Sequence, residues 1–203
     1  MRWVYVDGAC KKNGQPDAAA GYGVWFGNNH RLNVSEVVSG DLHSNNVAEL
    51  QAAKAAIEIG IREGFNGLII YTDSEYVYQG IIIIHLKDAH YILGVYIIKI
   101  SYKNSIEGIT NWIFNWKQND WRTASGRPVA NKSEWEDLEE AYNNFEEYHG
   151  EIIWRRIQAH NNNFGNEEAD RLAKEAAERA FHNNQNDYYD DDEDDDDDYD
   201  YYY

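Results

Sequence analysis

Short apolar runs of strand length and longer helix-like stretches follow one another along the chain in a defined order. Runs of β-branched and aromatic residues at Trp3–Val6, Gly21–Phe26 and Leu32–Val38 are separated by polar, Gly-containing stretches, which indicates three antiparallel strands. Two further runs of strand length occur at Leu68–Tyr71 and Glu151–Ile157. The chain therefore opens with a three-stranded meander and then returns to single strands.

Three stretches have the composition and spacing of helices. In Val47–Ile61 apolar residues return near helical spacing among alanines, and Gly64 is placed to end the helix. Ser133–Tyr148 is rich in Trp and Glu, and Glu167–Ala180 is rich in Ala and charged residues. The resulting order, β-β-β-α-β-α-β-α, predicts an α/β fold in which helices cover both faces of a five-stranded mixed sheet.

Two segments lie outside this order. Gly80–Glu107 is dense in Ile and Tyr, but charged residues and histidines interrupt it too often for a membrane span. The residues from Asp187 to Tyr203 include eleven acids and no Lys or Arg. The net charge is −18 for the whole chain and only −7 without these residues. A block of like charges with nothing aliphatic to bury predicts disorder. We expect one domain, residues 1–181, with an insertion at 80–107 and a disordered tail at 182–203.

Cysteine usage and the N-terminal sequence point to a reducing compartment. Cys10 is the single cysteine, which excludes an internal disulfide, and the start MRWVYVDG lacks the layout of a secretory signal. We therefore expect an intracellular monomer in the cytoplasm or nucleus, with no membrane association. Nucleic-acid binders usually have basic surfaces, but most of the negative charge here lies in the tail.

Four carboxylates lie at the ends of predicted strands or near the starts of predicted helices. Each has an ordinary explanation: a turn for Asp7, a capping box with Asn46 for Glu49, a helix cap for Asp73 and compensation of the helix dipole for Asp170. A parallel pair of strands would nevertheless bring Asp7 and Asp73 side by side. Such a cluster is unfavourable without a cation, and its hard oxygen ligands suit Mg²⁺.

Four motifs of the chain resemble, in order, the signatures of type 1 ribonuclease H. They are Tyr5-Val6-Asp7-Gly8; Asn45-Asn46-Val47-Ala48-Glu49-Leu50; Tyr71-Thr72-Asp73-Ser74; and His160 followed by Gly165-Asn166-Glu167-Glu168-Ala169-Asp170-Arg171-Leu172-Ala173. The resemblance covers residues 2–79 and 108–180. It implies a ribonuclease H-like fold and an endonuclease that hydrolyses the RNA strand of RNA–DNA hybrids, giving 5′-phosphate and 3′-hydroxyl ends.

The resemblance also implies a two-metal site. Its ligands are Asp7, Glu49, Asp73 and Asp170, which would hold two Mg²⁺ ions, with Mn²⁺ able to replace them. His160 corresponds to a mobile histidine that the family uses for product release or proton transfer. The Asn-rich loop after it suits a residue that moves.

Seven further residues correspond to family positions that contact the hybrid. Three amides, Asn13, Asn45 and Asn46, are expected in the minor groove, where they can recognise the RNA 2′-hydroxyl. Two tryptophans, Trp112 and Trp116, are expected to contact the DNA strand. Two polar residues, Ser44 and Asn131, are expected in a pocket that binds a phosphate of the DNA strand. The two tryptophans are also spaced to share one face of a helix, which leaves a core role open. Leu42 replaces the arginine of the phosphate pocket, so we expect a weaker grip on the DNA strand.

Two alternatives to an active enzyme stay open. The chain could be a hybrid-binding protein in which Gly80–Glu107 impairs catalysis, or a ribonuclease H domain derived from a retroelement. The Ile, Tyr, Asn and Lys bias of Gly80–Glu107 is typical of translated AT-rich noncoding DNA. We therefore hypothesise that this segment is a retained intron or an error in the assignment of the coding region.

Overall fold

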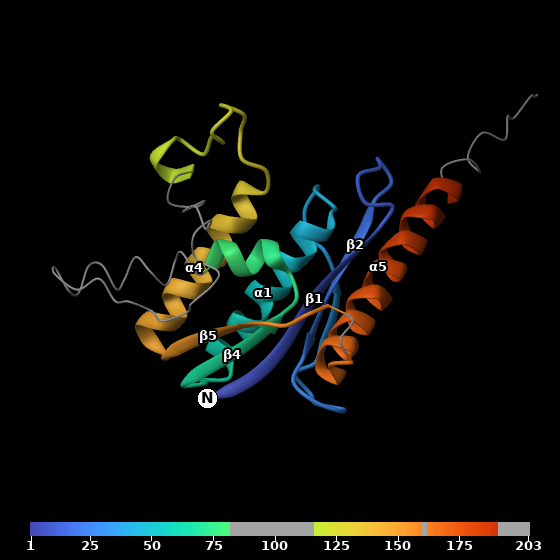
Figure 1. Cartoon of the computed structure of the whole chain (residues 1–203). Helices are drawn as coiled ribbons and strands as arrows, with labels where there is room; N and C mark the ends of the chain where they lie inside the picture. The colour runs from blue at the N-terminus through green and yellow to red at the C-terminus, as the bar shows by residue number, and fades with distance from the viewer. Residues whose placement is uncertain (82–115, 160–161, 191–203) are drawn as a thin grey trace, which may run out of the picture.

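The elements of the chain follow the predicted order (Figure 1). The computed structural model describes residues 1–81, 116–159 and 162–190. The strands are β1 Arg2–Lys11, β2 Ala19–Trp25, β3 Val34–Val37, β4 Gly67–Thr72 and β5 Glu151–Arg156. The helices are α1 Asn45–Arg62, α4 Lys132–Tyr148 and α5 Phe164–Asp190. The predicted succession of strands and helices is confirmed.

The five strands form one mixed sheet in the order β3-β2-β1-β4-β5. The first three strands pair antiparallel, with Asp7 opposite Gly23, whereas β4 pairs parallel with both β1 and β5. In the β1–β4 pair, Tyr5 lies beside Tyr71. Because β1 and β4 run in the same direction, Asp7 and Asp73, two residues further along, also lie next to each other. The mixed sheet is as predicted.

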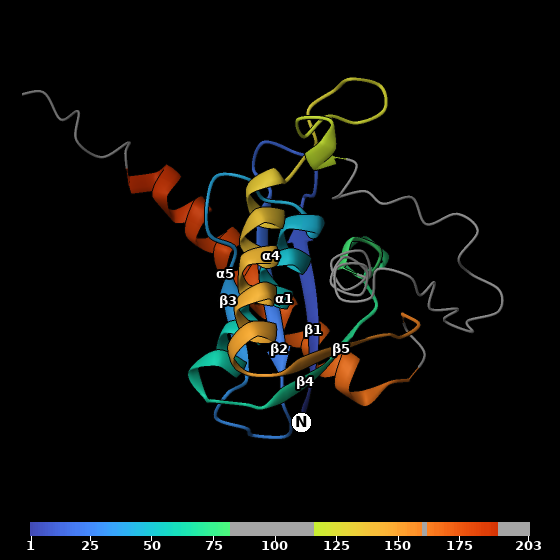
Figure 2. The same ribbon diagram turned by 90° about the vertical axis from the view of Figure 1, so that its left-hand side faces the viewer.

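Helices cover both faces of the sheet, as expected. Figures 1 and 2 show α5 on one face and α1 with α4 on the other. The main apolar core lies between the sheet and α1 and α4, where Trp135, Tyr142 and Phe145 of α4 are fully buried. In the described ranges, no helix is long and apolar enough to cross a membrane.

The helix α5 approaches β2 closely because small residues face each other across the contact. A Cβ atom added to Gly23 would lie 2.1 Å from the carbonyl oxygen of Ala169, and one added to Gly21 would lie 2.4 Å from the Cβ atom of Ala176. Glycine in the strand and alanine in the helix therefore let the two backbones meet. This contact holds the first turns of α5 beside β1.

The ends of α5 differ from the predicted Glu167–Ala180. The helix continues to Asp190, so residues 182–190, which we expected to be disordered, are helical. Two properties favour the extension as far as residue 186: His182 lies 3.1 Å from Glu178 one turn earlier, and the block of acids begins only at Asp187. The rest of the expected tail, 191–203, lies outside the described residues.

The expected insertion begins inside the domain rather than beside it. A helical stretch at 75–81 includes Gly80 and Ile81. Ile81 is fully buried in the core, and a Cβ atom on Gly80 would lie 2.1 Å from the ring of Trp135. These two residues therefore belong to the packed body of the protein. The remainder of the segment, 82–107, lies outside the described residues.

Candidate active site

Three carboxylates from distant parts of the chain converge at one end of the β1–β4 pair. Asp7 lies on β1, Glu49 on α1 and Asp73 directly after β4. One oxygen from each residue lies within 4.8 Å of the others. Asp7 and Asp73 are side by side, as the parallel pairing of their strands requires.

The ordinary structural explanations do not apply to these three acids. Asp7 is not in a turn, because β1 continues past it to Lys11. The cap of α1 is Ser44, whose hydroxyl accepts a backbone N–H at 3.2 Å, so Glu49 lies beyond the capping box. At the helical stretch 75–81 the hydroxyl of Ser74, and not Asp73, accepts a backbone N–H at 3.4 Å. None of the three carboxylates therefore acts as a turn former or a helix cap.

The cluster concentrates negative charge in a buried place. Burial, together with the charges of Asp73 and Asp170, raises the pKa of Asp7 from its ordinary 3.8 to about 8. Burial and the charges of Asp7 and Asp73 also raise the pKa of Glu49 well above its usual range. The buried Oε2 atom of Glu49 has no hydrogen-bond partner in the described part of the chain. A divalent cation would supply the missing partner and neutralise the charge.

Asn166 in the first turn of α5 supports the cluster from one side. This residue is 6% exposed, and its Nδ2 atom donates a hydrogen bond of 2.9 Å to Oδ2 of Asp73. The backbone N–H of Asn166 is in turn held by the side chain of Asn163 at 3.3 Å. Asn166 is not among the expected site residues, although it lies within the motif that contains Asp170.

Asp170 lies near the cluster but is not part of it in this structure. It is the seventh residue of α5, beyond the first turn, so compensation of the helix dipole does not explain it. Its Oδ2 atom is 2.7 Å from Nζ of Lys174 in an ion pair, and its charge contributes to the raised pKa of Asp7. His160 lies outside the described residues.

The predicted minor-groove amides gather at the start of α1. The side chain of Asn13, in the connection after β1, accepts a hydrogen bond of 3.2 Å from the backbone N–H of Asn45. Asn45 and Asn46 are exposed at the beginning of the helix that contains Glu49. The three amides are therefore brought to the same end of α1 as the carboxylate.

The other predicted substrate residues also have structural contacts. Asn131 has a left-handed backbone, with a φ of 58°, at the cap of α4, and its side chain donates to the hydroxyl of Tyr76 at 3.3 Å. The ring of Trp116 is half-buried, 6.2 Å from the ring of Trp121 and 6.4 Å from that of Trp135. Trp112 lies outside the described residues.

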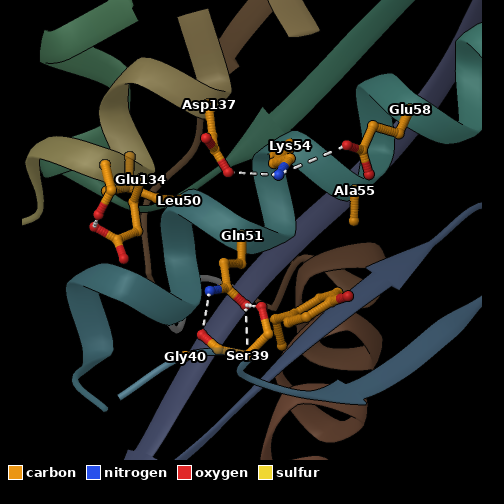
Figure 3. A pocket seen from close by; sticks show the side chains of 11 residues that line it. Ser39, Gly40, Leu50, Gln51, Lys54, Ala55, Glu58, Glu134 and Asp137 are labelled. Carbon is orange, nitrogen blue, oxygen red and sulfur yellow. Dashed lines mark hydrogen bonds and ion pairs between the residues drawn. The ribbon is translucent and has the colours of Figure 1, made fainter. Parts of the chain in front are cut away.

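A hollow of about 240 Å³ between α1, α4 and the segment after β3 is separate from the acids (Figure 3). Gln51 exchanges two hydrogen bonds, of 3.0 and 2.9 Å, with the backbone of Ser39. Lys54 lies 2.7 Å from Asp137 and 3.8 Å from Glu58. Because these polar groups are already paired, we interpret the hollow as part of the packing contact between α1 and α4.

The fold and the acid cluster define a ribonuclease H-like protein. A solved type 1 RNase H with the type 2 active-site motif, LC9-RNase H1, is 23% identical with a TM-score of 0.54, over 88% of this chain and 72% of that one. The PFV RNase H domain in solution is 19% identical with a TM-score of 0.51, over 87% of this chain and 94% of that one. These likenesses establish the class of fold.

The family follows from the sequence comparisons. The RNase H family model matches residues 2–93 and 95–178. Ribonuclease H1 of Rattus norvegicus is 36% identical over 177 residues, which are 87% of this chain and 50% of the rat protein. Ribonuclease H of Cyanothece sp. is 31% identical over 175 residues, 84% of this chain and 85% of that protein. The chain belongs to the RNase H family, a family of divalent-metal-dependent endoribonucleases, and is of type 1.

Two further facts follow from the matched ranges. The chain spans about half the length of the mammalian relatives that it matches. The family model also runs through Gly80–Glu107 and omits only residue 94, whereas we expected the resemblance to stop at residue 79 and to resume at residue 108. That the segment is a retained intron stays a hypothesis.

Proposed function

We propose that this chain is an endonuclease that hydrolyses the RNA strand of RNA–DNA hybrids and leaves 5′-phosphate and 3′-hydroxyl ends. The observation that supports this most directly is the convergence of Asp7, Glu49 and Asp73 within 4.8 Å in a member of the RNase H family. No local structural role accounts for the convergence, and its charge calls for a cation.

Asp7, Glu49, Asp73 and Asp170 are the residues that would hold two Mg²⁺ ions, or Mn²⁺ in their place. Bound ions of this kind supply a water nucleophile at neutral pH and neutralise charge on the leaving oxygen of a phosphodiester. The unpartnered Oε2 atom of Glu49 and the raised pKa of Asp7 support this fit.

For Asp170 to become a ligand, its ion pair with Lys174 must open. The side chains are 34% and 64% exposed, and exposed pairs of this kind contribute only about 0–1 kcal/mol. The opening therefore costs little, and the side chain is then free to turn toward Asp7. The ion pair is consistent with a fourth ligand that joins the cluster on metal binding.

The protein's own groups orient the site and select the substrate. The backbone N–H of Gly8 fixes one oxygen of Asp7 at 2.8 Å, and Asn166 fixes one oxygen of Asp73. Asn45 and Asn46 present amides that both donate and accept, as recognition of a 2′-hydroxyl requires. We assign His160 to product release or proton transfer.

The test is cleavage of a labelled RNA–DNA hybrid by Asp73→Asn. Removing one ligand charge should lower the cleavage rate by at least about 100-fold, while hybrid affinity, measured by fluorescence anisotropy, stays close to that of the unaltered chain. Asp137→Asn is the matched control, because Asp137 pairs with Lys54 away from the cluster. Undiminished cleavage by Asp73→Asn would contradict the site.

A further inference from the structure

Five aromatic side chains line a second, open hollow of about 580 Å³. They come from three strands and the first residue of α5, and they are Trp3, Tyr5, Trp25, Tyr71 and Phe164. Trp3 and Phe164 are 46% and 54% exposed at the rim, whereas Trp25 is only 6% exposed. The rings of Tyr5 and Tyr71 stack at 4.6 Å with an interplanar angle of 15°. We call this surface the aromatic hollow.

The aromatic hollow lies directly beside the acid cluster on the same face of the sheet. Alternate residues of a strand point to the same side, so Trp3 and Tyr5 share the face of Asp7. The paired tyrosines Tyr5 and Tyr71 are therefore one row of side chains, about 7 Å, from Asp7 and Asp73. A strand of nucleic acid at the acids would pass over these rings if it continued in this direction.

The first turn of α5 touches both features. A Cβ atom added to Gly165 would lie 2.4 Å from the ring of Tyr5, and the next residue, Asn166, bonds to Asp73. In Figure 1 the beginning of α5 lies against the sheet beside β1. The aromatic hollow and the acid cluster therefore share a wall, and α5 does not cover the rings at the rim.

An unpaired cation stands at the edge of the same surface. Arg155 of β5 lies beside Tyr71 in the strand register, and its neighbour Trp154 is buried on the opposite face. Arg155 is exposed and has no ion pair or hydrogen bond to residues in the described ranges. Arg156, by contrast, is paired with Glu75 at 3.2 Å.

We propose that the aromatic hollow and Arg155 bind an unpaired extension of the RNA strand whose paired part occupies the acid cluster. Bases stack on the exposed rings of Trp3 and Phe164, and Arg155 neutralises a backbone phosphate. Exposed rings with a cation hold single strands without sequence preference, because every base has a face that stacks. An apolar protein partner would leave the charge of Arg155 unmatched, whereas RNA supplies both a base and a phosphate. This inference rests on the proposed function, because it assumes that the RNA strand at the acid cluster continues over the aromatic hollow.

The test compares a blunt RNA–DNA hybrid with the same hybrid bearing unpaired RNA at its 5′ or 3′ end. Binding is measured by fluorescence anisotropy in EDTA, which prevents cleavage. An extension at one end should tighten binding, and Trp3→Ala and Phe164→Ala should each weaken binding of that extended hybrid by about fivefold or more, with the blunt hybrid unaffected. Tyr148→Ala, at a residue 71% exposed at the end of α4, is the aromatic control.

Arg155→Gln provides a readout that packing alone would not change. Loss of one phosphate contact should lower the slope of log affinity against log salt by about 0.7 for the extended hybrid. Arg62→Gln removes the same charge at a side chain 64% exposed at the end of α1, and should leave the slope unchanged. Because Arg155 has no ion pair or hydrogen bond to lose in the described part of the chain, this variant should fold normally.

Three results would overturn the inference. One is equal affinity for blunt and extended hybrids, and another is wild-type binding by both Trp3→Ala and Arg155→Gln. The third is a dimer in sedimentation that Trp3→Ala abolishes without any effect on RNA affinity, which would assign the surface to a second copy. Cleavage of the blunt hybrid with Mg²⁺ is measured in parallel. Its absence would contradict the proposed function, while the binding data in EDTA would still decide the role of the aromatic hollow.

Discussion

The carboxylate of Glu49 has one oxygen that lacks, among the described residues, the partner that most buried polar groups have. Its Oε2 atom is buried, and no hydrogen bond satisfies it within the described residues. Glu49 is not needed to cap α1, because the hydroxyl of Ser44 already accepts a backbone N–H at the start of this helix. Burial of such a group without a partner is unfavourable, so it persists only where another function requires it.

The pH dependence of stability should expose the buried charge of Asp7. Folding raises the pKa of Asp7 from 3.8 to about 8, so the folded chain keeps a proton that the unfolded chain releases. Its contribution to the unfolding free energy is full below pH 3.8 and is lost as the pH rises toward about 8. In metal-free protein Asp7 alone should contribute a slope of, at most, about −1.4 kcal/mol per pH unit, and the raised pKa of Glu49 adds to the slope with the same sign.

Urea unfolding in EDTA between about pH 5 and pH 8 measures this slope. Asp7→Asn has no titrating carboxyl at this position, so its unfolding free energy should depend less steeply on pH than that of the unaltered chain. Added Mg²⁺ should also reduce the slope by favouring the ionised form. Parallel curves for the two proteins would show that Asp7 does not titrate in this window.

Asn166 should act as a positioning residue for Asp73. Asn166→Ala removes the 2.9 Å hydrogen bond, and changes of this kind next to metal ligands typically cost about 10- to 100-fold in metal affinity or activity. We expect the Mg²⁺ concentration for half-maximal cleavage to rise by a factor in this range, with the rate largely restored at saturating metal. Asn144→Ala, on the exposed side of α4, is the control. An unchanged metal requirement would contradict the assignment.

Sequence patterns located the helices and strands well because the apolar residues of each segment recur at the spacing of the helix or strand that it forms. The start of α5 was missed by three residues, since Phe164 and Gly165 do not continue the helical pattern. Contacts decide that boundary: Asn163 binds the backbone N–H of Asn166, and Gly165 lies on the ring of Tyr5. An Asn three residues before a helical N–H is a capping signal that the sequence does contain.

The site could be predicted only where a motif marked it. The acids Asp7, Glu49 and Asp73 each belong to a motif that is present in the sequence, although β1 continues past Asp7 to Lys11. The aromatic hollow does not, because Trp3 and Tyr5 look like ordinary strand residues until the register sets them beside Tyr71 and Arg155. Pairing between strands distant in sequence is not visible in the local pattern of either one.

The contact between β1 and α1 should control both stability and catalysis. A Cβ atom on Gly8 would lie 2.4 Å from the backbone nitrogen of Glu49, so Gly8→Ala must force β1 and α1 apart. We expect urea unfolding to show a loss of about 1–3 kcal/mol, and cleavage to fall because Asp7 and Glu49 separate.

Gly40→Ala is the comparison for this variant. A Cβ atom there would meet nothing within 4 Å, but the φ of +88° makes any side chain strained. It should cost about 1 kcal/mol of stability and leave cleavage unchanged. Equal cleavage by Gly8→Ala and Gly40→Ala would show that the spacing of β1 and α1 does not set the geometry of the acids.

At the scale of the whole chain, a deletion of the expected insertion must keep a Gly-Ile pair at positions 80 and 81, because both residues pack in the domain. The same pair recurs as Gly108-Ile109, so deleting 80–107 and deleting 82–109 give the same protein. That protein keeps a Gly-Ile pair to pack against Trp135. Shortening the connection should raise the unfolding free energy by on the order of 1 kcal/mol and preserve cleavage. Urea unfolding and hybrid cleavage of both chains test this, and loss of cooperative unfolding in the shortened chain would contradict it.

Substrate selection tests most directly whether the acid cluster acts on the RNA of a hybrid. The full chain is incubated with Mg²⁺ and duplexes of one sequence prepared as RNA–DNA, RNA–RNA and DNA–DNA, with each strand labelled in turn. We predict that cleavage occurs only in the RNA strand of the hybrid, leaves 5′-phosphates, and stops in EDTA and in Asp73→Asn. Cleavage of all three duplexes, or hybrid cleavage that survives both EDTA and Asp73→Asn, would contradict the proposed function.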